Sequence, residues 1–222
     1  MPRTYHALGA LLTYPTPDLR QAVGDIASVL ADERLVPVEP LRGFLKEIAG
    51  ADIYDLQERY VDLFDRGRAV SLHLFEHVHG ESRDRGQAMA DLIALYGEHG
   101  LEMAPGELPD YLPLFLEFLS LLPADVARPL LAEPGTILRE LADRLARRHA
   151  GYAVVMQALA DLARAPAQGA SDIPEEDPDD LAALDAAWEE TAVTFGPGAA
   201  AACGPDRLRT RLRAATHDVN VD

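Results

Sequence analysis

Imidazole and carboxylate side chains gather in the segment HLFEHVHGE, which contains His73, Glu76, His77, His79 and Glu81. Residues four apart share a helix face, so His73 and His77 could together chelate a divalent cation. His79 or Glu81 could supply a third ligand. The two glutamates could instead act as an acid and a base in catalysis. The segment therefore allows either metal binding or acid–base chemistry.

Neither chemistry has its usual sequence pattern here. The order of residues differs from H-E-x-x-H, in which one helix supplies two metal ligands and a general base. Gly80 predicts a helix end just after the histidines, where their side chains interact favourably with the helix dipole. The glutamates stand among four arginines, including Arg66 and Arg85, which favours ion-pair networks over catalysis. We expect a packed, hydrogen-bonded histidine cluster and no metal site.

The rest of the chain has no catalytic signature. It contains no G-x-S-x-G elbow, no P-loop and no dinucleotide-binding glycine pattern. Cys203 is the only cysteine, which excludes an intrachain disulfide and a cysteine-based zinc site. We therefore predict no catalytic residues, no cofactor and no enzymatic activity.

Charge and hydropathy restrict the partners and the location. The formal net charge of −17 repels phosphate backbones and anionic lipid surfaces, whereas it attracts a cationic peptide. The first residues lack the apolar core and cleavage site of a secretory signal. The most apolar run, 112–123, is too short to span a bilayer. We predict a soluble cytoplasmic protein that binds neither nucleic acid nor membrane.

Two apolar helical stripes flank the histidine segment. The first lies on a helix that Asp52 could cap, and its positions are Ile53, Leu56, Tyr60, Leu63 and Phe64. The second follows Pro109 and Asp110, has Pro113 in its first turn, and comprises Tyr111, Leu114, Phe115, Phe118 and Leu122. Between them Met89, Leu92, Ile93 and Tyr96 repeat the spacing, with Gly97 and Gly100 as a stop. The stripes could be core, or they could line a groove for an amphipathic helix.

Helical patterns also cover 3–13, 18–31, 40–50 and a long segment from about 136 to 164, and no β-alternation is convincing. The predicted fold is all-α, a single-domain helical bundle over residues 1–164. Residues 165–180 are rich in proline and acidic residues, which predicts a flexible linker. Residues 181–222 are predicted to be a short helical, variable tail.

Two blocks of sequence resemble a known family. They are ERYVDLFDRGRAVSLHLFEHVHGESRDRGQAMADLIALY (58–96) and ELPDYLPLFLEFL (107–119), and the opening YHALGALLTYP also fits. The family is that of the nitrate reductase molybdenum cofactor assembly chaperones, also called the delta subunit, within the helical redox-enzyme maturation chaperones. The first block is specific to this family, and the second is shared across the wider group.

The resemblance implies a dedicated cytoplasmic chaperone. Such a protein binds the amino-terminal segment of the nitrate reductase catalytic (alpha) subunit in the apo alpha–beta complex. It keeps that complex open for molybdenum cofactor insertion and prevents premature docking to the membrane. Delivery proteins for the cofactor could be further partners.

Motif position assigns a peptide-recognition region, with no assignment of individual contacts. The residues carried over from the family are Arg66, His73, Glu76, His77, His79, Glu81, Pro113 and Glu117. The residues that the apolar patterns add are Tyr60, Phe64, Phe75, Tyr111, Leu114 and Phe118. We expect at least half of the carried-over residues to support the fold and not to touch a peptide.

An alternative function is direct carriage of the molybdenum cofactor or a metal. The loop DRGRAVS, with Arg66 and Arg68, could cradle the phosphates of a cofactor, and the histidines His73, His77 and His79 could bind a metal.

Overall fold

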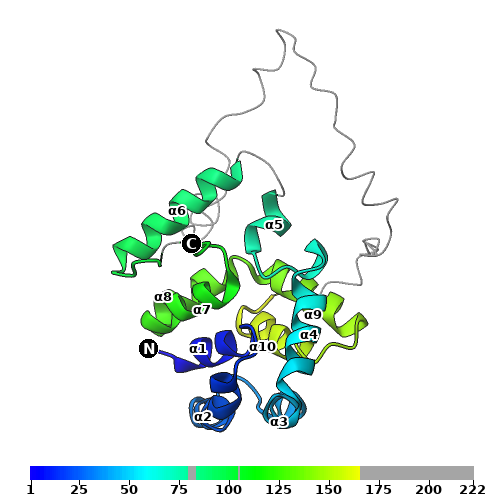
Figure 1. Cartoon of the computed structure of the whole chain (residues 1–222). Coiled ribbons are helices and arrows are strands. Elements are labelled where there is room, and N and C mark those ends of the chain that lie inside the picture. The colour runs from blue at the N-terminus through cyan, green and yellow to red at the C-terminus, as the bar shows by residue number, and fades with distance from the viewer. Residues whose placement is uncertain (80–83, 105, 166–222) are drawn as a thin grey trace, which may run out of the picture. The chain divides into compact units, whose positions relative to one another are not determined.

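The computed structural model describes residues 1–79, 84–104 and 106–165, and within these ranges the fold is entirely helical (Figure 1). The α-helices are α1 (Arg3–Ala10), α2 (Pro17–Glu33), α3 (Arg42–Gly50), α4 (Ile53–Phe64), α5 (Leu74–His79), α6 (Asp84–Glu98), α7 (Leu112–Leu121), α8 (Ala124–Ala132), α9 (Gly135–Arg147) and α10 (Ala153–Leu162). Two 3-10 helices are η1 (Glu39–Leu41) and η2 (Arg68–Val70). The predicted all-α class is confirmed, whereas residues 166–222, with most of the predicted linker and all of the tail, lie outside the described residues.

Helix α1 packs against both α2 and α7, between which it lies in Figure 1. Its first N–H groups, those of Arg3 and Thr4, donate to the Glu33 carboxylate at the end of α2, at 3.0 and 2.8 Å. Gly9 faces α7, and a Cβ there would lie 3.2 Å from the Cβ of Leu116 and 3.3 Å from the carbonyl oxygen of Pro113. The missing side chain therefore lets α1 cross α7 closely.

Helix α4 begins as the sequence predicts and packs on an aromatic cluster. The Asp52 side chain accepts a hydrogen bond from the Tyr54 N–H at 2.8 Å, which caps the helix. Tyr60 and Phe64 on its buried face contact each other, with ring centroids 4.9 Å apart. Both rings also meet Tyr152 at the start of α10, at 6.0 and 5.0 Å. This packing joins α4 to the core of the protein.

The structure corrects the helix predicted over 136–164, which is two helices. After α9 the chain turns at His149, whose φ of 52° is left-handed, and the Ala150 N–H donates to the Leu145 carbonyl. A side chain at Gly151 would meet the Phe44 ring at 2.6 Å, so the turn is packed closely against α3. The apolar pattern of 136–164 is helical throughout, but the chain breaks into two helices at a turn that packs against α3. Helix α8 is a further element that the sequence pattern does not predict.

Helix α6 also differs from its predicted limits and face. Gly97 lies inside the helix, and the turn after it uses Gly100, whose φ is 79°. The buried positions are Ala88 and Tyr96, whereas Ile93 is exposed although the predicted stripe includes it. None of the helices within the described residues is long and apolar enough to cross a membrane.

Candidate functional site

Segments of the two sequence blocks, one before α6 and one after it, meet in an antiparallel bridge between His73 and Tyr111. The Leu112 N–H donates to the Leu72 carbonyl at 2.8 Å, and the Leu74 N–H donates to the Asp110 carbonyl at 3.0 Å. His73 therefore has extended backbone and precedes α5. The bridge brings together two segments that lie far apart in the chain, and we call this region the block junction (residues 71–77 and 109–112).

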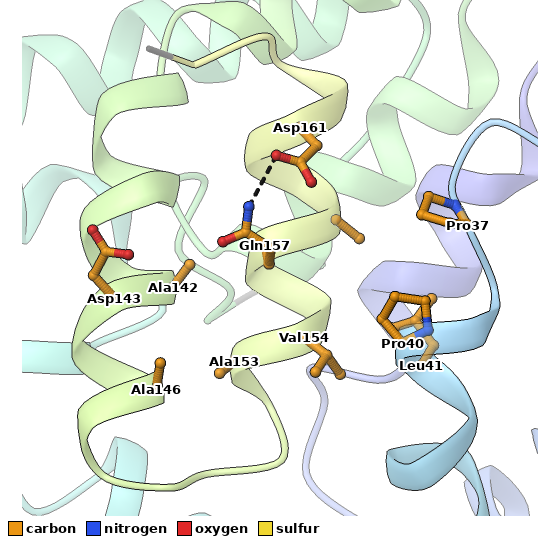
Figure 2. A pocket seen from close by; sticks show the side chains of 11 residues that line it. Pro37, Pro40, Leu41, Ala142, Asp143, Ala146, Ala153, Val154, Gln157 and Asp161 are labelled. Atoms are coloured by element: carbon orange, nitrogen blue, oxygen red, sulfur yellow. Dashed lines mark hydrogen bonds between the residues drawn. The ribbon is translucent and has the colours of Figure 1, made fainter. Parts of the chain in front are cut away.

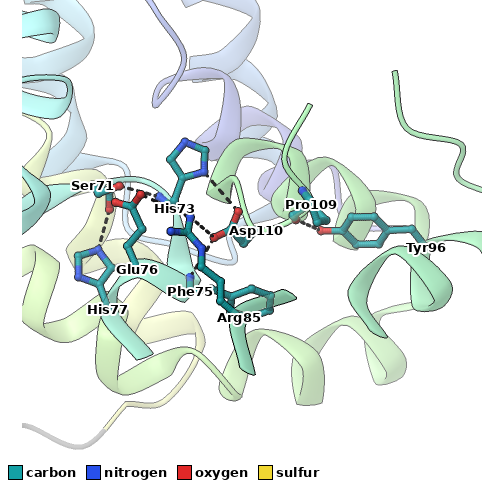
Figure 3. A network of polar contacts seen from close by, with 9 residues as sticks. All are labelled: Ser71, His73, Phe75, Glu76, His77, Arg85, Tyr96, Pro109 and Asp110. Atoms are coloured by element: carbon teal, nitrogen blue, oxygen red, sulfur yellow. Dashed lines mark hydrogen bonds and ion pairs between the residues drawn. The ribbon is translucent and has the colours of Figure 1, made fainter. Parts of the chain in front are cut away.

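Asp110 organises the block junction from a fully buried position (Figure 3). Its carboxylate accepts hydrogen bonds from the Phe75 N–H at 3.1 Å and from Nδ1 of His73 at 3.3 Å. The guanidinium of Arg85 lies 3.7 Å away. Because Phe75 is in the first turn of α5, Asp110 caps that helix from a distant part of the chain. A buried carboxylate with this many donors is a strong structural constraint.

Arg85 and Tyr96 attach α6 to the block junction. Arg85, in the first turn of α6, pairs with Glu76 at 3.4 Å as well as with Asp110. The Tyr96 hydroxyl donates to the Pro109 carbonyl at 2.7 Å (Figure 3). Burial, and after it the charge of Asp110, raises the pKa of Tyr96, so this phenol stays a donor. The predicted ion-pair role of Glu76 is confirmed.

His73 and His77, the two histidines of the segment HLFEHVHGE whose side chains are described, contact different partners. His73 donates to Asp110, whereas Nε2 of His77 donates to the Ser71 carbonyl at 2.8 Å (Figure 3). The predicted shared helix face is wrong because His73 lies before α5. Burial lowers the pKa of His77, and the nearby charge of Arg144 acts in the same direction, so the neutral form is favoured.

Among the described side chains, no group of three or more His, Cys, Asp or Glu residues is placed to hold a metal ion. Glu81 and the side chain of His79 lie outside the described residues. The loop with Arg66 is described, and Arg66 pairs there with Asp62 at 3.2 Å.

A row of rings extends from the block junction across α4. The hydroxyl of Tyr60 donates to the Leu12 carbonyl at 3.0 Å and accepts from the hydroxyl of Tyr111 at 3.3 Å. The Tyr111 ring lies 5.4 Å from that of His73, and the Tyr14 ring meets Tyr60 edge-on at 5.6 Å. We call Tyr14, Tyr60, Tyr111 and His73 the aromatic strip. Tyr60 is buried, while Tyr14 is 44% exposed and the other two are partly exposed.

Burial separates the predicted recognition residues into three groups. The buried ones are Tyr60, Phe64, Pro113 and Phe118. The partly exposed ones are His73, Phe75, Glu76, His77, Tyr111 and Leu114. The exposed ones are Arg66 and Glu117. The buried group supports the surface in this structure, and the block junction gathers most of the partly exposed group. Membership of the recognition region stays a prediction.

Sequence reasoning missed Asp110 as a site residue. The sequence pattern places Asp110 only at the start of a helix, because neighbouring residues do not indicate that its carboxylate will cap a different helix. The proline–aspartate pattern of the second block is the signal that could have found it. Tyr14 was missed in the same way, since its ring contact with Tyr60 joins residues that are distant in the chain.

A separate groove with a volume of about 230 Å³ lies along α10, between α9 and the segment 37–41 (Figure 2). Small apolar side chains line it, among them Ala142, Ala153 and Ala158, with Gln157 and Asp161 hydrogen-bonded to each other at 2.9 Å. None of the predicted site residues lines this groove, so its surface provides positions for control substitutions.

The sequence matches known proteins over most of its length. A family model described as nitrate reductase delta subunit matches residues 17–153. The chain is 45% identical over 192 residues to the nitrate reductase molybdenum cofactor assembly chaperone NarJ of Escherichia coli strain K12, covering 83% of this chain and 81% of that protein. It is 41% identical over 216 residues to the probable nitrate reductase molybdenum cofactor assembly chaperone NarW of the same strain, covering 96% of this chain and 92% of NarW.

The fold likewise matches a solved structure. A redox enzyme maturation protein from Archaeoglobus fulgidus superimposes with a TM-score of 0.56, covering 74% of this chain and 94% of that one. The sequence identity of 21% limits this likeness to the fold. It confirms the predicted helical maturation-chaperone architecture.

Proposed function

The chain belongs to the nitrate reductase delta subunit family, and on this premise we propose that it is a dedicated assembly chaperone for a respiratory nitrate reductase. Like its relatives, which are chaperones, the chain is not an enzyme. Its client is the amino-terminal segment of the catalytic alpha subunit, here called the client segment. The chaperone holds the apo-enzyme in the cytoplasm, open for molybdenum cofactor insertion, and delays its docking to the membrane.

The observation that carries the proposal is the sequence likeness to assembly chaperones over most of the chain. The block junction adds support, because the blocks that define the likeness meet there. Partly exposed apolar and polar side chains, such as Phe75, Glu76 and Leu114, lie in or beside it. A peptide helix binds a surface of this kind by burying apolar side chains while charged residues set its orientation.

Apolar burial and charge have separate roles in this binding. Burial contributes about 25 cal/mol per Å² before the cost of ordering the peptide. The net charge of −17 speeds encounter with a basic client segment and makes the association rate depend on salt. The His73, His77 and Asp110 contacts keep the chaperone surface ordered before binding, which lowers the entropy cost.

Calorimetric titration with a peptide of the cognate alpha-subunit amino terminus tests the proposal. We expect micromolar or tighter binding by the wild-type chain, and a loss of at least about tenfold in the double variant Phe75→Ala, Glu76→Ala. Val154→Ala in the α10 groove removes apolar surface elsewhere and should bind as the wild type does. Absence of binding by the folded wild-type chain would overturn the proposal.

A gene deletion in cells tests the proposed role in molybdenum cofactor insertion. Deleting the gene should yield nitrate reductase that lacks molybdenum, with apo-enzyme attached prematurely to the membrane. The double variant at Phe75 and Glu76 should complement the deletion poorly, whereas Val154→Ala should complement it fully. Nitrate reductase of normal molybdenum content in the deletion strain would contradict this part.

A further inference from the structure

Helix α7 is apolar on almost every side, yet one face of it stays open to solvent. Glu117 and Ser120 are the polar residues of its sequence LPLFLEFLSL. Leu114 is partly exposed, Glu117 is exposed and Leu121 is 46% exposed. Residues at positions i, i+3 and i+7 share a helix face, and we call Leu114, Glu117 and Leu121 the α7 stripe. Since a helix that is apolar all round is normally fully buried, this stripe is a surface that a partner could cover.

Neighbouring elements pack on both sides of the α7 stripe and leave it exposed. On one side the Phe118 ring meets those of Tyr96 and His99 at the end of α6, with centroids 4.7 and 5.6 Å apart. On the other side Gly9 of α1 faces Leu116, and α7 lies between α6 and α1 in Figure 1. Phe118 and Leu116 are fully buried, so these contacts hold the helix in place. A surface that is ordered before binding lowers the entropy cost of binding a partner.

The α7 stripe starts next to the block junction. Tyr111 is the N-cap residue of α7, and it belongs both to the block junction and to the aromatic strip. Leu114 follows it by three residues, which is about one helical turn. From Tyr111 to Leu121 the helix rises by about 15 Å, which matches about three turns of a second helix. The partly exposed residues of the block junction and the α7 stripe can therefore contact one continuous helical segment.

Glu117 determines which kind of helix fits the stripe. Within the described residues its carboxylate forms no ion pair or hydrogen bond, and only its backbone carbonyl accepts, from the Ser120 hydroxyl at 2.6 Å. Lysine and arginine combine a cation for this carboxylate with an apolar stem that packs on leucine side chains. A second copy of the chain fits poorly, because a two-fold contact would face the acidic stripe with itself between chains that each carry a net charge of −17. A basic amphipathic helix is the complementary partner.

We propose that the client segment binds as a helix that extends from the block junction along the α7 stripe. One Lys or Arg of the client pairs with Glu117, and apolar client residues lie on Leu114 and Leu121. Two facing helices meet every three to four residues, so the client must carry an apolar residue at that distance on each side of the cation. This inference rests on the proposed function. It adds Leu121 as a specificity-determining residue and gives the pattern of residues that the client must have.

A charge exchange across the proposed pair tests this inference. The full-length wild type and Glu117→Lys are titrated by calorimetry with the alpha-subunit peptide and with peptides in which each Lys or Arg in turn is Glu. Glu117→Lys should weaken binding of the unchanged peptide about fivefold to tenfold, because it places two cations opposite each other. One of the exchanged peptides should bind Glu117→Lys more tightly than it binds the wild type, which identifies the paired client residue.

Matched variants distinguish the α7 stripe from general effects of charge and hydrophobicity. Leu121→Gln removes apolar surface from the stripe and should weaken binding about threefold to tenfold. Tyr54→Gln removes an apolar side chain that is 76% exposed on α4, and its affinity should stay within about twofold of the wild type. Glu58→Lys makes the same charge change at an exposed glutamate inside α4 and should also stay within about twofold. Circular dichroism and urea midpoints confirm that each variant is folded.

The possible outcomes separate the two proposals. If the wild type binds the peptide and no exchanged peptide prefers Glu117→Lys, the stripe is not the binding surface while the chaperone function stands. Equal weakening by Glu58→Lys and Glu117→Lys would also overturn the inference, since it would indicate long-range attraction alone. A chain that sediments as a dimer and becomes a monomer in Leu121→Gln would assign the stripe to a second copy instead. If the wild type binds no alpha-subunit peptide, both proposals fail.

Discussion

Replacing Asp110 with alanine tests whether one buried carboxylate holds the block junction together. Its side chain has no exposed surface and accepts from the Phe75 N–H at 3.1 Å and His73 at 3.3 Å, with Arg85 at 3.7 Å. Alanine leaves the Phe75 N–H and the His73 Nδ1–H without their acceptor, while Arg85 keeps its pair with Glu76. A buried donor without an acceptor costs about 1–3 kcal/mol, so the free energy of unfolding should fall by about 2–4 kcal/mol. Asp110→Asn keeps the shape of the side chain and one acceptor oxygen. We therefore expect it to lower the free energy of unfolding by only roughly 1–2 kcal/mol.

Urea denaturation followed by far-ultraviolet circular dichroism measures these free energies. Asp161→Ala is the matched control, because Asp161 also accepts two hydrogen bonds, from Arg139 at 2.8 Å and Gln157 at 2.9 Å, but is 54% exposed. Because the Asp161 carboxylate is exposed, its pair with Arg139 should contribute only about 1 kcal/mol although the Arg139 side chain is largely buried. Hydrogen exchange of the Phe75 amide should accelerate in Asp110→Ala. Equal stability losses in the Asp110 and Asp161 alanine variants would refute the reasoning.

Three further predictions concern stability. Gly151→Ala should lower the free energy of unfolding by roughly 1–3 kcal/mol, since its Cβ would meet the Phe44 ring at 2.6 Å, and thermal denaturation measures the loss. His77→Gln should flatten the fall in stability below about pH 6.5. Burial lowers the pKa of His77 in the folded protein, so its stabilisation is complete above the unfolded pKa and is lost as the pH falls; urea midpoints at pH 7.5 and 5.5 measure it. Asp65→Asn should raise stability by about 0.3–1 kcal/mol at low salt, because it removes a carboxylate from a helix C-terminus.

Each of these three has its own control or contrary result. Gly24→Ala, inside α2 with no atom within 4 Å of the new Cβ, should stabilise the protein by about 0.5–1 kcal/mol. Asp55→Asn should lower stability, since it removes a carboxylate from a helix N-terminus. An unchanged pH dependence in His77→Gln would assign the acid sensitivity to other groups.

Local sequence signals predicted much of the helical framework. Asp52 caps α4 as expected, and Pro113 lies in the first turn of α7, because capping and proline geometry depend on a few adjacent residues. Apolar periodicity likewise placed Tyr60 and Phe64 on one buried face. The two blocks 58–96 and 107–119 were enough to identify the family, since their residue order is specific over many positions.

Long-range contacts decided what those signals could not. The sequence indicated a histidine cluster, but in the structure His73 and His77 bond to different partners, because Asp110 holds His73 in a bridge ahead of α5. The helical pattern of 136–164 continues through a turn whose Gly151 lies against α3. Composition and periodicity therefore determined the fold class, and the resemblance of the two blocks identified the family. Only the tertiary structure made Asp110 the centre of the block junction and brought Tyr14, Tyr60, Tyr111 and His73 together, since both depend on segments that meet only when the chain folds.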